Sequence, residues 1–343
     1  MNYPRIMIAA PKSGSGKTTI TCGLLKALKD RGYNPCSFKC GPDYIDPMFH
    51  RNVIGIEAGN LDTFFTEPDI TRRIFKAEYV GNVAVIEGVM GLYDGVGGVE
   101  KQGSSYDLAE TLQCPIILVV DAKGAGKSIL AEIKGFLDYD KKQLIRGVIL
   151  NKTSPSFANI LKPLIEEELG IKFLGAFESD NEISFSSRHL GLVIPTEIAN
   201  LKEQLERLAT SISKRINLDE LIDIAESERD IFSRLAPWLP TDNVNEIRLA
   251  VARDRAFCFY YKENLEMLKS LGVELVEFSP LKDASLPKNI SGLLLGGGYP
   301  EDYLKELSQN SSMKRSIKEA IESGVPTLAE CGGFMYLMDE IEV

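Results

Sequence analysis

A glycine-rich segment at residues 11–19 carries the residue types that bind phosphate groups. Glycines let backbone N–H groups turn toward an anion, and here Lys17 would neutralise the β/γ-phosphate charge while Thr18 offers its hydroxyl to magnesium. Pro11 replaces the usual first glycine, but the spacing fits the variant with a second lysine five residues before the invariant one. The residues expected to bind nucleotide are Lys12, Ser13, Gly14, Ser15, Gly16, Lys17, Thr18 and Thr19.

A second glycine-rich segment, residues 123–128, resembles the first but has Asp121 in place of the first glycine. We expect it to lie beside the nucleotide without holding the triphosphate. Asn151 begins a run that resembles the guanine-reading motif of GTPases, but Ser154 stands where that motif needs Asp. Asn151 either bonds the edge of adenine, which favours ATP, or only ends a strand as a turn residue.

Four carboxylates follow predicted strands. Asp43 and Asp46 lie in a loop defined by glycine and proline, and Glu87 ends a buried strand ahead of Asp94. Strand ends of a parallel sheet share one edge, so Glu87 and Asp94 should face the phosphate loop. Acids beside a triphosphate repel it unless a divalent cation intervenes, which predicts an Mg²⁺ site of Thr18, Asp43 and Glu87. Any one of these acids, taken alone, could equally be a solvated loop residue.

Cys331 lies between an apolar run and two glycines, an arrangement typical of a nucleophile elbow. The following helix would stabilise a thiolate, and the backbone N–H groups of Gly297 and Gly298 could form an oxyanion hole. A cysteine taken alone could equally be a buried core residue. A nucleophile of this kind needs a histidine base, and the two histidines, His50 and His189, both lie in the part of the chain expected to form the first domain.

The elements that must position these residues follow an α/β pattern. Short β-branched runs alternate with helical patterns such as residues 18–31, which implies a parallel sheet covered on both sides. We expect an ATP-binding domain at residues 1–199, a helical connector at 200–245 and a second α/β domain at 246–343. The strands predicted in the first domain are residues 5–10, 83–86, 116–120 and 147–150.

Composition limits the class of protein. The 343 residues are 44% hydrophobic and 26% charged, as in globular proteins, and no apolar run approaches the ~20 residues of a membrane-spanning helix. The net charge of -10 without a basic cluster argues against nucleic acid as a partner. The six cysteines lack paired metal-binding spacing, and the N-terminus lacks the features of a signal peptide, so we expect a cytoplasmic protein.

Several runs besides the phosphate loop resemble the cobyrinic acid a,c-diamide synthase family, in the same order and over essentially the whole chain. They are FKCGPDYIDPMFH (38–50), EGVMGLYDG (87–95), ARDRAFCFYYKENLEML (252–268), LLLGGGYPE (293–301) and AECGGFMYL (329–337). The resemblance implies a P-loop doubly wound parallel sheet, similar to dethiobiotin synthetase, followed by a class I glutamine amidotransferase domain. The family places the glutaminase His and Glu downstream of the cysteine, so we expect this second domain to be incomplete.

The resemblance also implies a reaction: ATP-dependent amidation of the a and c acetate groups of a corrin-type tetrapyrrole. Acyl phosphates would be the intermediates, and Cys331 would release the nitrogen from glutamine. Lys39 would supplement the phosphate-binding cations, Tyr44 would contact the substrate, and a homodimer is compatible with this interpretation. The acids that would position substrate or metal, or accept a proton, are Asp43, Asp46 and Asp94.

The sequence also fits other tetrapyrrole substrates and one other class of protein. The tetrapyrrole could also be hydrogenobyrinic acid or nickel sirohydrochlorin, and adenosylcobyric acid synthase fits the quoted runs less well. A partitioning-type ATPase switch shares the spacing of Lys12 and Lys17. That hypothesis leaves Cys331 and the glycines at 296–298 unexplained.

Overall fold

The computed structural model describes residues 2–178, 195–227, 230–235 and 247–341. The chain divides into two compact units, Met1–Pro237 and Trp238–Val343, and each is described by itself. The part of the expected connector beyond residue 235 lies outside the described residues, as does His189. Within the described ranges, no helix is both long and apolar enough to cross a membrane.

The first unit is built on a parallel sheet of seven strands in the order β3-β2-β4-β1-β5-β6-β7. The strands are β1 (Arg5–Ala9), β2 (Pro35–Cys40), β3 (Ala58–Leu61), β4 (Val83–Glu87), β5 (Ile116–Asp121), β6 (Ile145–Asn151) and β7 (Lys172–Phe177). This sheet confirms the predicted fold class. Because all strands run the same way, the phosphate loop and the four acids follow strand ends at one edge of the sheet.

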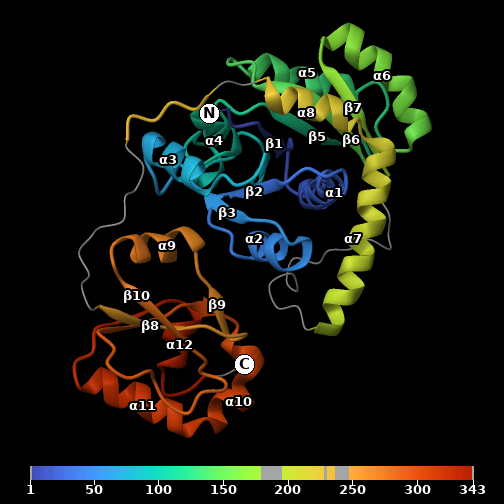
Figure 1. Ribbon diagram of the computed structural model, residues 1–343. Helices are drawn as coiled ribbons and strands as arrows, with labels where there is room; N and C mark the ends of the chain where they lie inside the picture. Colours follow the sequence, from blue (N-terminus) through green and yellow to red (C-terminus); the bar gives the residue numbers. More distant parts are fainter. Residues whose placement is uncertain (1, 179–194, 228–229, 236–246, 342–343) are drawn as a thin grey trace. The chain divides into compact units, whose positions relative to one another are not determined.

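Helices cover both faces of the sheet (Figure 1). They are α1 (Lys17–Asp30), α2 (Ile45–Phe49), α3 (Pro68–Glu78), α4 (Ser105–Leu112), α5 (Ile129–Tyr139), α6 (Pro155–Leu169), α7 (Pro195–Arg215) and α8 (Leu218–Glu226). Successive residues of β1 point to opposite faces of the sheet. Ile6 and Ile8 belong to the core formed with α1, α7 and α8, whereas Met7 and Ala9 belong to the core formed with α3 to α6. Helices α7 and α8, which lie in the expected connector, thus complete one layer of the first unit.

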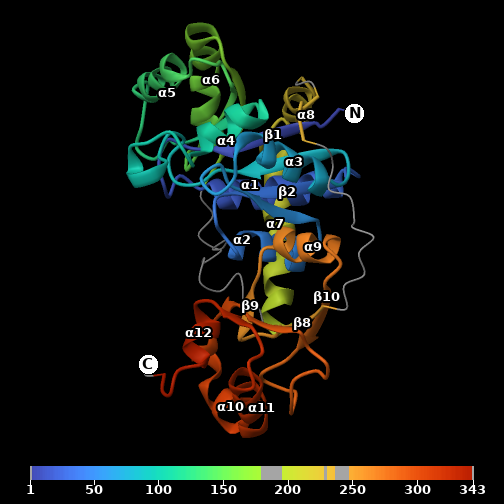
Figure 2. The same ribbon diagram turned by 90° about the vertical axis from the view of Figure 1, so that its left-hand side faces the viewer.

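The second unit contains a parallel four-stranded sheet in the order β10-β8-β11-β13 and a small antiparallel pair, β12-β9. Figure 2 shows α9 on one side of the larger sheet and α10 and α11 on the other. The strands are β8 (Arg248–Ala252), β9 (Phe257–Phe259), β10 (Glu274–Phe278), β11 (Gly292–Leu295), β12 (Gly297–Gly298) and β13 (Thr327–Ala329). The helices are α9 (Lys262–Ser270), α10 (Leu304–Gln309), α11 (Ser311–Glu322) and α12 (Gly332–Tyr336).

Candidate functional site

The phosphate loop joins β1 to α1, as its motif requires. Gly14 and Gly16 have φ angles of 76° and 94°, a left-handed conformation that glycine adopts without strain. A Cβ on Gly16 would lie 2.1 Å from Asn151 Nδ2, so no larger residue fits there. The Ser15 hydroxyl donates to the Lys12 carbonyl at 2.9 Å, while the side chains of Lys12 and Ser13 are exposed. The loop is therefore preorganised by its own contacts.

Lys17 begins α1 and is buried. Its Nζ donates to the carbonyl of Met90, a non-glycine residue held at a φ of 47°. Burial lowers the pKa of Lys17, an effect opposed by Glu87 and reinforced by Lys39. A buried ammonium group on a single carbonyl is poised to exchange that partner for phosphate oxygens. This arrangement suits the role expected for Lys17.

Glu87, at the end of β4, is completely buried and connects the phosphate loop to Lys39. Its Oε1 accepts from the Thr18 hydroxyl at 2.6 Å and from Lys39 Nζ at 2.8 Å. Its Oε2 has no hydrogen-bond partner among the described residues. A buried carboxylate oxygen without a partner is costly, so it marks a position where a ligand would be favourable.

Lys39 lies at the centre of the acidic cluster. Its Nζ is 2.6 Å from Asp46 Oδ2 and 3.9 Å from Asp43 Oδ2. Burial alone would lower the pKa of Lys39, but Glu87 and Asp46 together outweigh burial and raise it, so this lysine stays charged. For Asp46, burial and then Glu87 raise the pKa. For Asp43, burial and then Asp46 raise it.

The two aspartates of the loop after β2 have different surroundings. Asp43 Oδ1 accepts from the backbone N–H groups of Ile45 and Asp46, at 2.8 and 3.2 Å, and so holds the start of α2. Asp46 is more deeply buried and shares Lys39 with Glu87. The structure thus brings Asp46 closer to the predicted metal ligands than Asp43, which the sequence had grouped with Thr18 and Glu87. Tyr44 precedes α2 and is half-buried.

Asp94 belongs to the loop that follows β4. Its Oδ2 accepts from the N–H of Gly91 at 2.9 Å, and a Cβ on Gly91 would lie 2.6 Å from the Pro11 carbonyl oxygen. The N–H of Leu92 donates to the Ala10 carbonyl at 2.8 Å. Asp94 therefore shapes a loop that packs directly against the phosphate loop, and a direct role for its carboxylate there stays a prediction.

Asn151, at the end of β6, contacts the phosphate loop. Its Nδ2 donates to the Ser15 carbonyl at 2.7 Å, and its Oδ1 accepts from the N–H of Lys152 at 2.9 Å. The contact with adenine stays a prediction. Sequence reasoning did not identify Lys152, whose Nζ donates to the Gly14 carbonyl at 2.8 Å and pairs with Asp121 at 2.6 Å. These bonds fix the phosphate loop from the β5–β6 side.

Among the residues that the structure describes, segment 123–128 forms no hydrogen bond or ion pair with the phosphate loop. Lys127 lies on the surface, where its Nζ pairs with Glu168 of α6 at 3.0 Å. The expected position of this segment beside the nucleotide stays a prediction. His50 is also no free base: it is buried, with Nδ1 2.8 Å from Ser37 Oγ and Nε2 3.6 Å from Cys22 Sγ. Burial lowers the pKa of His50 to about 4.

Cys331 occupies the sharp turn between β13 and α12. It is exposed and has φ 48° and ψ -113°, a strained conformation of the kind that persists at active sites. A Cβ on Gly297 would lie 3.4 Å from Cys331 Cβ, and one on Gly333 would lie 2.2 Å from the Leu295 carbonyl oxygen. Glycine at these positions permits the elbow to approach the loop that contains Gly297 and Gly298.

Two further residues of the second unit support this elbow and were missed from sequence. The Tyr260 hydroxyl donates to the Ala252 carbonyl at 2.5 Å and accepts from the N–H of Gly296 at 2.8 Å. Asp254 Oδ1 accepts from the N–H groups of Ala256 and Phe257. The run ARDRAFCFYY therefore holds the strand ends together, a role that no spacing rule reveals.

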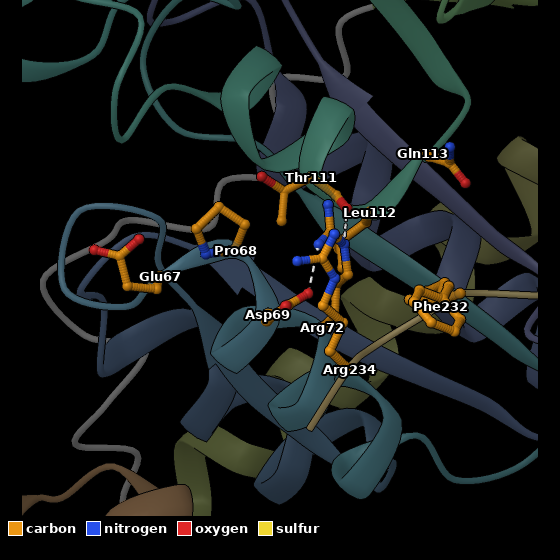
Figure 3. Close-up of a pocket in the computed structure, with 10 residues that line it drawn as sticks. Glu67, Pro68, Asp69, Arg72, Thr111, Leu112, Gln113, Phe232 and Arg234 are labelled. Carbon is orange, nitrogen blue, oxygen red and sulfur yellow. Dashed lines mark hydrogen bonds and ion pairs between the residues drawn. The ribbon is translucent and has the colours of Figure 1, made fainter. Parts of the chain in front are cut away.

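A separate cavity of about 430 Å³ lies in the first unit (Figure 3). Arg72 crosses it, donating to the Thr111 carbonyl and pairing with Asp69, each at 2.8 Å. Leu112 and Gln113 also line it, and their carbonyls accept from Arg5 at the start of β1. That side of the cavity lies at the end of β1 away from the phosphate loop.

The fold and site define a class, a nucleotide-binding P-loop unit joined in one chain to a cysteine-elbow amidotransferase unit. Residues 6–193 match the family model described as the CobQ/CobB/MinD/ParA nucleotide binding domain. Residues 248–343 match that of the CobB/CobQ-like glutamine amidotransferase domain. The chain therefore combines a nucleotide-binding domain with a glutamine amidotransferase domain.

Proteins of similar sequence show which family the whole chain belongs to. The chain is 42% identical to a cobyrinate a,c-diamide synthase of Clostridium tetani over 98% of its own length and 75% of the relative. It is 44% identical to the cobyrinate a,c-diamide synthase of Clostridium acetobutylicum, over 98% of its own length and 76% of that relative. It is 42% identical to the cobyrinate a,c-diamide synthase of Thermoplasma volcanium, over 98% of its own length and 73% of that relative. The chain belongs to the family of cobyrinate a,c-diamide synthases, and it spans about three quarters of the length of these relatives.

Proposed function

We propose that this protein uses ATP to amidate the a and c acetate carboxylates of cobyrinate in cobalamin biosynthesis, with nitrogen released from glutamine. The observation that supports it most directly is the set of buried Glu87, Lys39 and Asp46, which is joined to the phosphate loop by the partly buried Thr18. A set of this kind binds a triphosphate and at the same time offers acids near the transferring phosphoryl group. A simple ATPase switch has no evident need for the second acid.

The residues present fit an Mg²⁺ ion. Glu87 Oε2 is buried and has no hydrogen-bond partner in the described part of the chain, and Oε1 of the same carboxylate accepts from the Thr18 hydroxyl. Magnesium takes one or two carboxylates together with phosphate oxygens, which matches this small donor set. Thr18 and Glu87 would hold the ion, with Asp46 nearby. When bound, the ion would neutralise charge on the β- and γ-phosphates.

The chemistry requires activation because a carboxylate is a poor electrophile. An acetate oxygen attacks the γ-phosphorus of ATP, the bond to ADP breaks, and an acyl phosphate forms. Lys17 stabilises charge on the transferring group. Ammonia then attacks the carbonyl carbon, phosphate leaves, and the nitrogen loses a proton. Asp43 and Asp46, whose pKa values are raised by burial, are suited to accept that proton.

In the second unit, Cys331 would attack the side-chain amide of glutamine and release ammonia. The backbone N–H groups around Gly297 and Gly298 would stabilise the oxyanion. Tyr260 holds the neighbouring Gly296 in place through its hydroxyl. This assignment makes the thiol necessary only when glutamine supplies the nitrogen.

The test is amidation with ammonium as nitrogen donor. Cobyrinate, hydrogenobyrinate and nickel sirohydrochlorin are each supplied with ATP and Mg²⁺, and the amides are counted by mass spectrometry. We expect two amides on cobyrinate, none with Lys17→Ala, and wild-type activity with Lys127→Ala as the matched control. Amidation of nickel sirohydrochlorin in preference to cobyrinate would reassign the substrate. ATP hydrolysis without any amide would contradict the proposed reaction.

A further inference from the structure

The loops that follow β3 and β4 carry exposed apolar side chains, among them two phenylalanines and two valines. Phe64 and Phe65 are 51% and 69% exposed, and Val96 and Val99 are 41% and 86% exposed. We call these four residues the apolar rim. Apolar side chains gathered on loops at the functional edge of a sheet indicate a contact with a ligand or partner.

The two aromatic residues of the rim are held in a defined turn. Asp62 Oδ1 accepts from the N–H groups of Phe64 and Phe65, at 2.6 and 3.2 Å, and the Thr66 hydroxyl donates to the Asp62 carbonyl at 2.6 Å. The two rings pack edge to face with their centroids 5.2 Å apart. A turn fixed in this way presents its rings to solvent at a low entropic cost on binding.

Asp107, in the first turn of α4, joins the two loops of the rim. Its Oδ2 accepts from the Thr63 hydroxyl at 2.6 Å and from the N–H of Gly103 at 3.1 Å. A Cβ on Gly103 would lie 3.4 Å from Phe64 Cβ and 3.9 Å from Val96 Cγ2, so these two side chains flank the same glycine. The rim is therefore one surface built from two loops.

The rim is continuous with the acidic cluster. Asn60, on β3, donates through Nδ2 to the carbonyls of Gly41 and Asp43, at 3.0 and 2.6 Å, and so ties the strand that leads to Phe64 to the acidic loop. Strands β1, β4, β2 and β3 are successive neighbours. Three strand spacings of about 4.8 Å therefore place the rim strand about 14 Å from the strand of the phosphate loop. A flat tetrapyrrole ring with its side chains can bridge that width.

We propose that the apolar rim binds the face of the tetrapyrrole ring and thereby directs its acetate groups toward the phosphate loop. This inference rests on the proposed function. In the inner part of the site Lys39 is already paired with Asp46 and Glu87, and the substrate is itself a polycarboxylate, so attraction between charges is a poor source of affinity there. Aromatic and branched aliphatic side chains instead gain free energy by burial and dispersion against a flat apolar ring.

The test measures cobyrinate binding by its visible absorption spectrum in titrations with the full chain, without nucleotide. We expect Phe64→Ser/Phe65→Ser to raise the Kd at least about tenfold and to raise KM similarly, because two rings are removed from the contact. The kcat with ammonium and the affinity for ATP should stay near wild type. Phe232→Ser is the matched control, since Phe232 is 76% exposed and lines the separate cavity beside Gln113 (Figure 3).

The outcomes separate the two proposals. A wild-type chain that binds and amidates cobyrinate, together with an unchanged Kd in the double variant, overturns the role of the rim and leaves the function intact. A wild-type chain that neither binds nor amidates a tetrapyrrole contradicts the function, and the inference falls with it. The third outcome is a double variant that sediments as a monomer where the wild type is a dimer, with an unchanged Kd for cobyrinate. That result would make the rim an interface between copies of the chain and would overturn the inference.

Discussion

At the scale of residues, the phosphate loop could be predicted because its chemistry depends on spacing alone. Lys12, Lys17 and Thr18 lie on one short segment, so no tertiary contact was needed to group them. Lys152 and Asp121 could not be found in this way, because they lie at the ends of two other strands. Lys152 donates to the Gly14 carbonyl and pairs with Asp121. The different surroundings of Asp43 and Asp46 could not be predicted either, because they depend on the burial of each side chain and on the position of Lys39.

Glu87→Gln should weaken metal-dependent ATP binding. The amide keeps the shape of the side chain but removes the charge beside the orphan Oε2, so we expect the Kd for ATP with Mg²⁺ to rise about tenfold. Binding without Mg²⁺ should change much less. Calorimetric titrations with and without Mg²⁺ measure both. Glu110→Gln, which alters a surface carboxylate paired with Lys101, is the control. An equal loss in both titrations would argue against Glu87 as a metal ligand.

His50 should make stability depend on pH. Its pKa falls from 6.5 to about 4 on folding, so between these values the unfolded chain binds more protons. Stability is therefore fully present above pH 6.5 and is lost as the pH falls toward 4, by roughly 3 kcal/mol in all. Urea unfolding at pH 7.5 and pH 5 should show a smaller pH difference for His50→Gln than for wild type. If the free energy of unfolding changed equally between the two pH values in both proteins, His50 would not be held neutral by the fold.

At the scale of elements, the strands of the first unit that sequence reasoning found are those with β-branched runs: β1, β4, β5 and β6. It missed β2, β3 and β7, whose sequences PCSFKC, AGNL and KFLGAF contain lysine, asparagine or glycine. Those polar residues include Lys39 and Asn60, which hold the acidic loop. Two of the three missed strands, β2 and β3, are thus ones whose side chains belong to the site, where function overrides strand propensity.

Tyr260→Phe should destabilise the second unit. The change removes the bonds to the Ala252 carbonyl and the Gly296 N–H, and we expect a loss of about 1–3 kcal/mol in the free energy of unfolding. Tyr336→Phe is a matched control, because its buried hydroxyl has no partner among the described residues and its removal should cost little. Urea unfolding of both variants gives the comparison. Equal effects would remove Tyr260 from the support of the cysteine elbow.

At the scale of the whole molecule, the two units carry different parts of one reaction. Both histidines belong to the first unit, and His50 is buried on Ser37 and Cys22. No histidine therefore occurs in the sequence of the second unit to serve Cys331 as a base. The nucleotide, metal and acid residues all belong to the first unit, so amidation itself does not depend on the thiol.

Replacement of Cys331 should separate the two nitrogen donors. We expect Cys331→Ala to lower glutamine-driven amidation at least about a hundredfold, because the thiol is the nucleophile that releases ammonia from glutamine. The same variant should leave the rate with ammonium unchanged, which is the internal control. Amide formation with each donor is followed by mass spectrometry. Glutamine-driven amidation that survives in Cys331→Ala would show that another residue is the nucleophile.

The central claim is that the first unit activates a substrate carboxylate as an acyl phosphate. The most direct measurement labels the cobyrinate carboxylates with ¹⁸O and follows the label during amidation with ATP and ammonium. We expect one ¹⁸O atom in the released phosphate for each amide formed, because the attacking acetate oxygen leaves with phosphorus. Phosphate free of ¹⁸O, with amides still forming, would exclude an acyl phosphate intermediate.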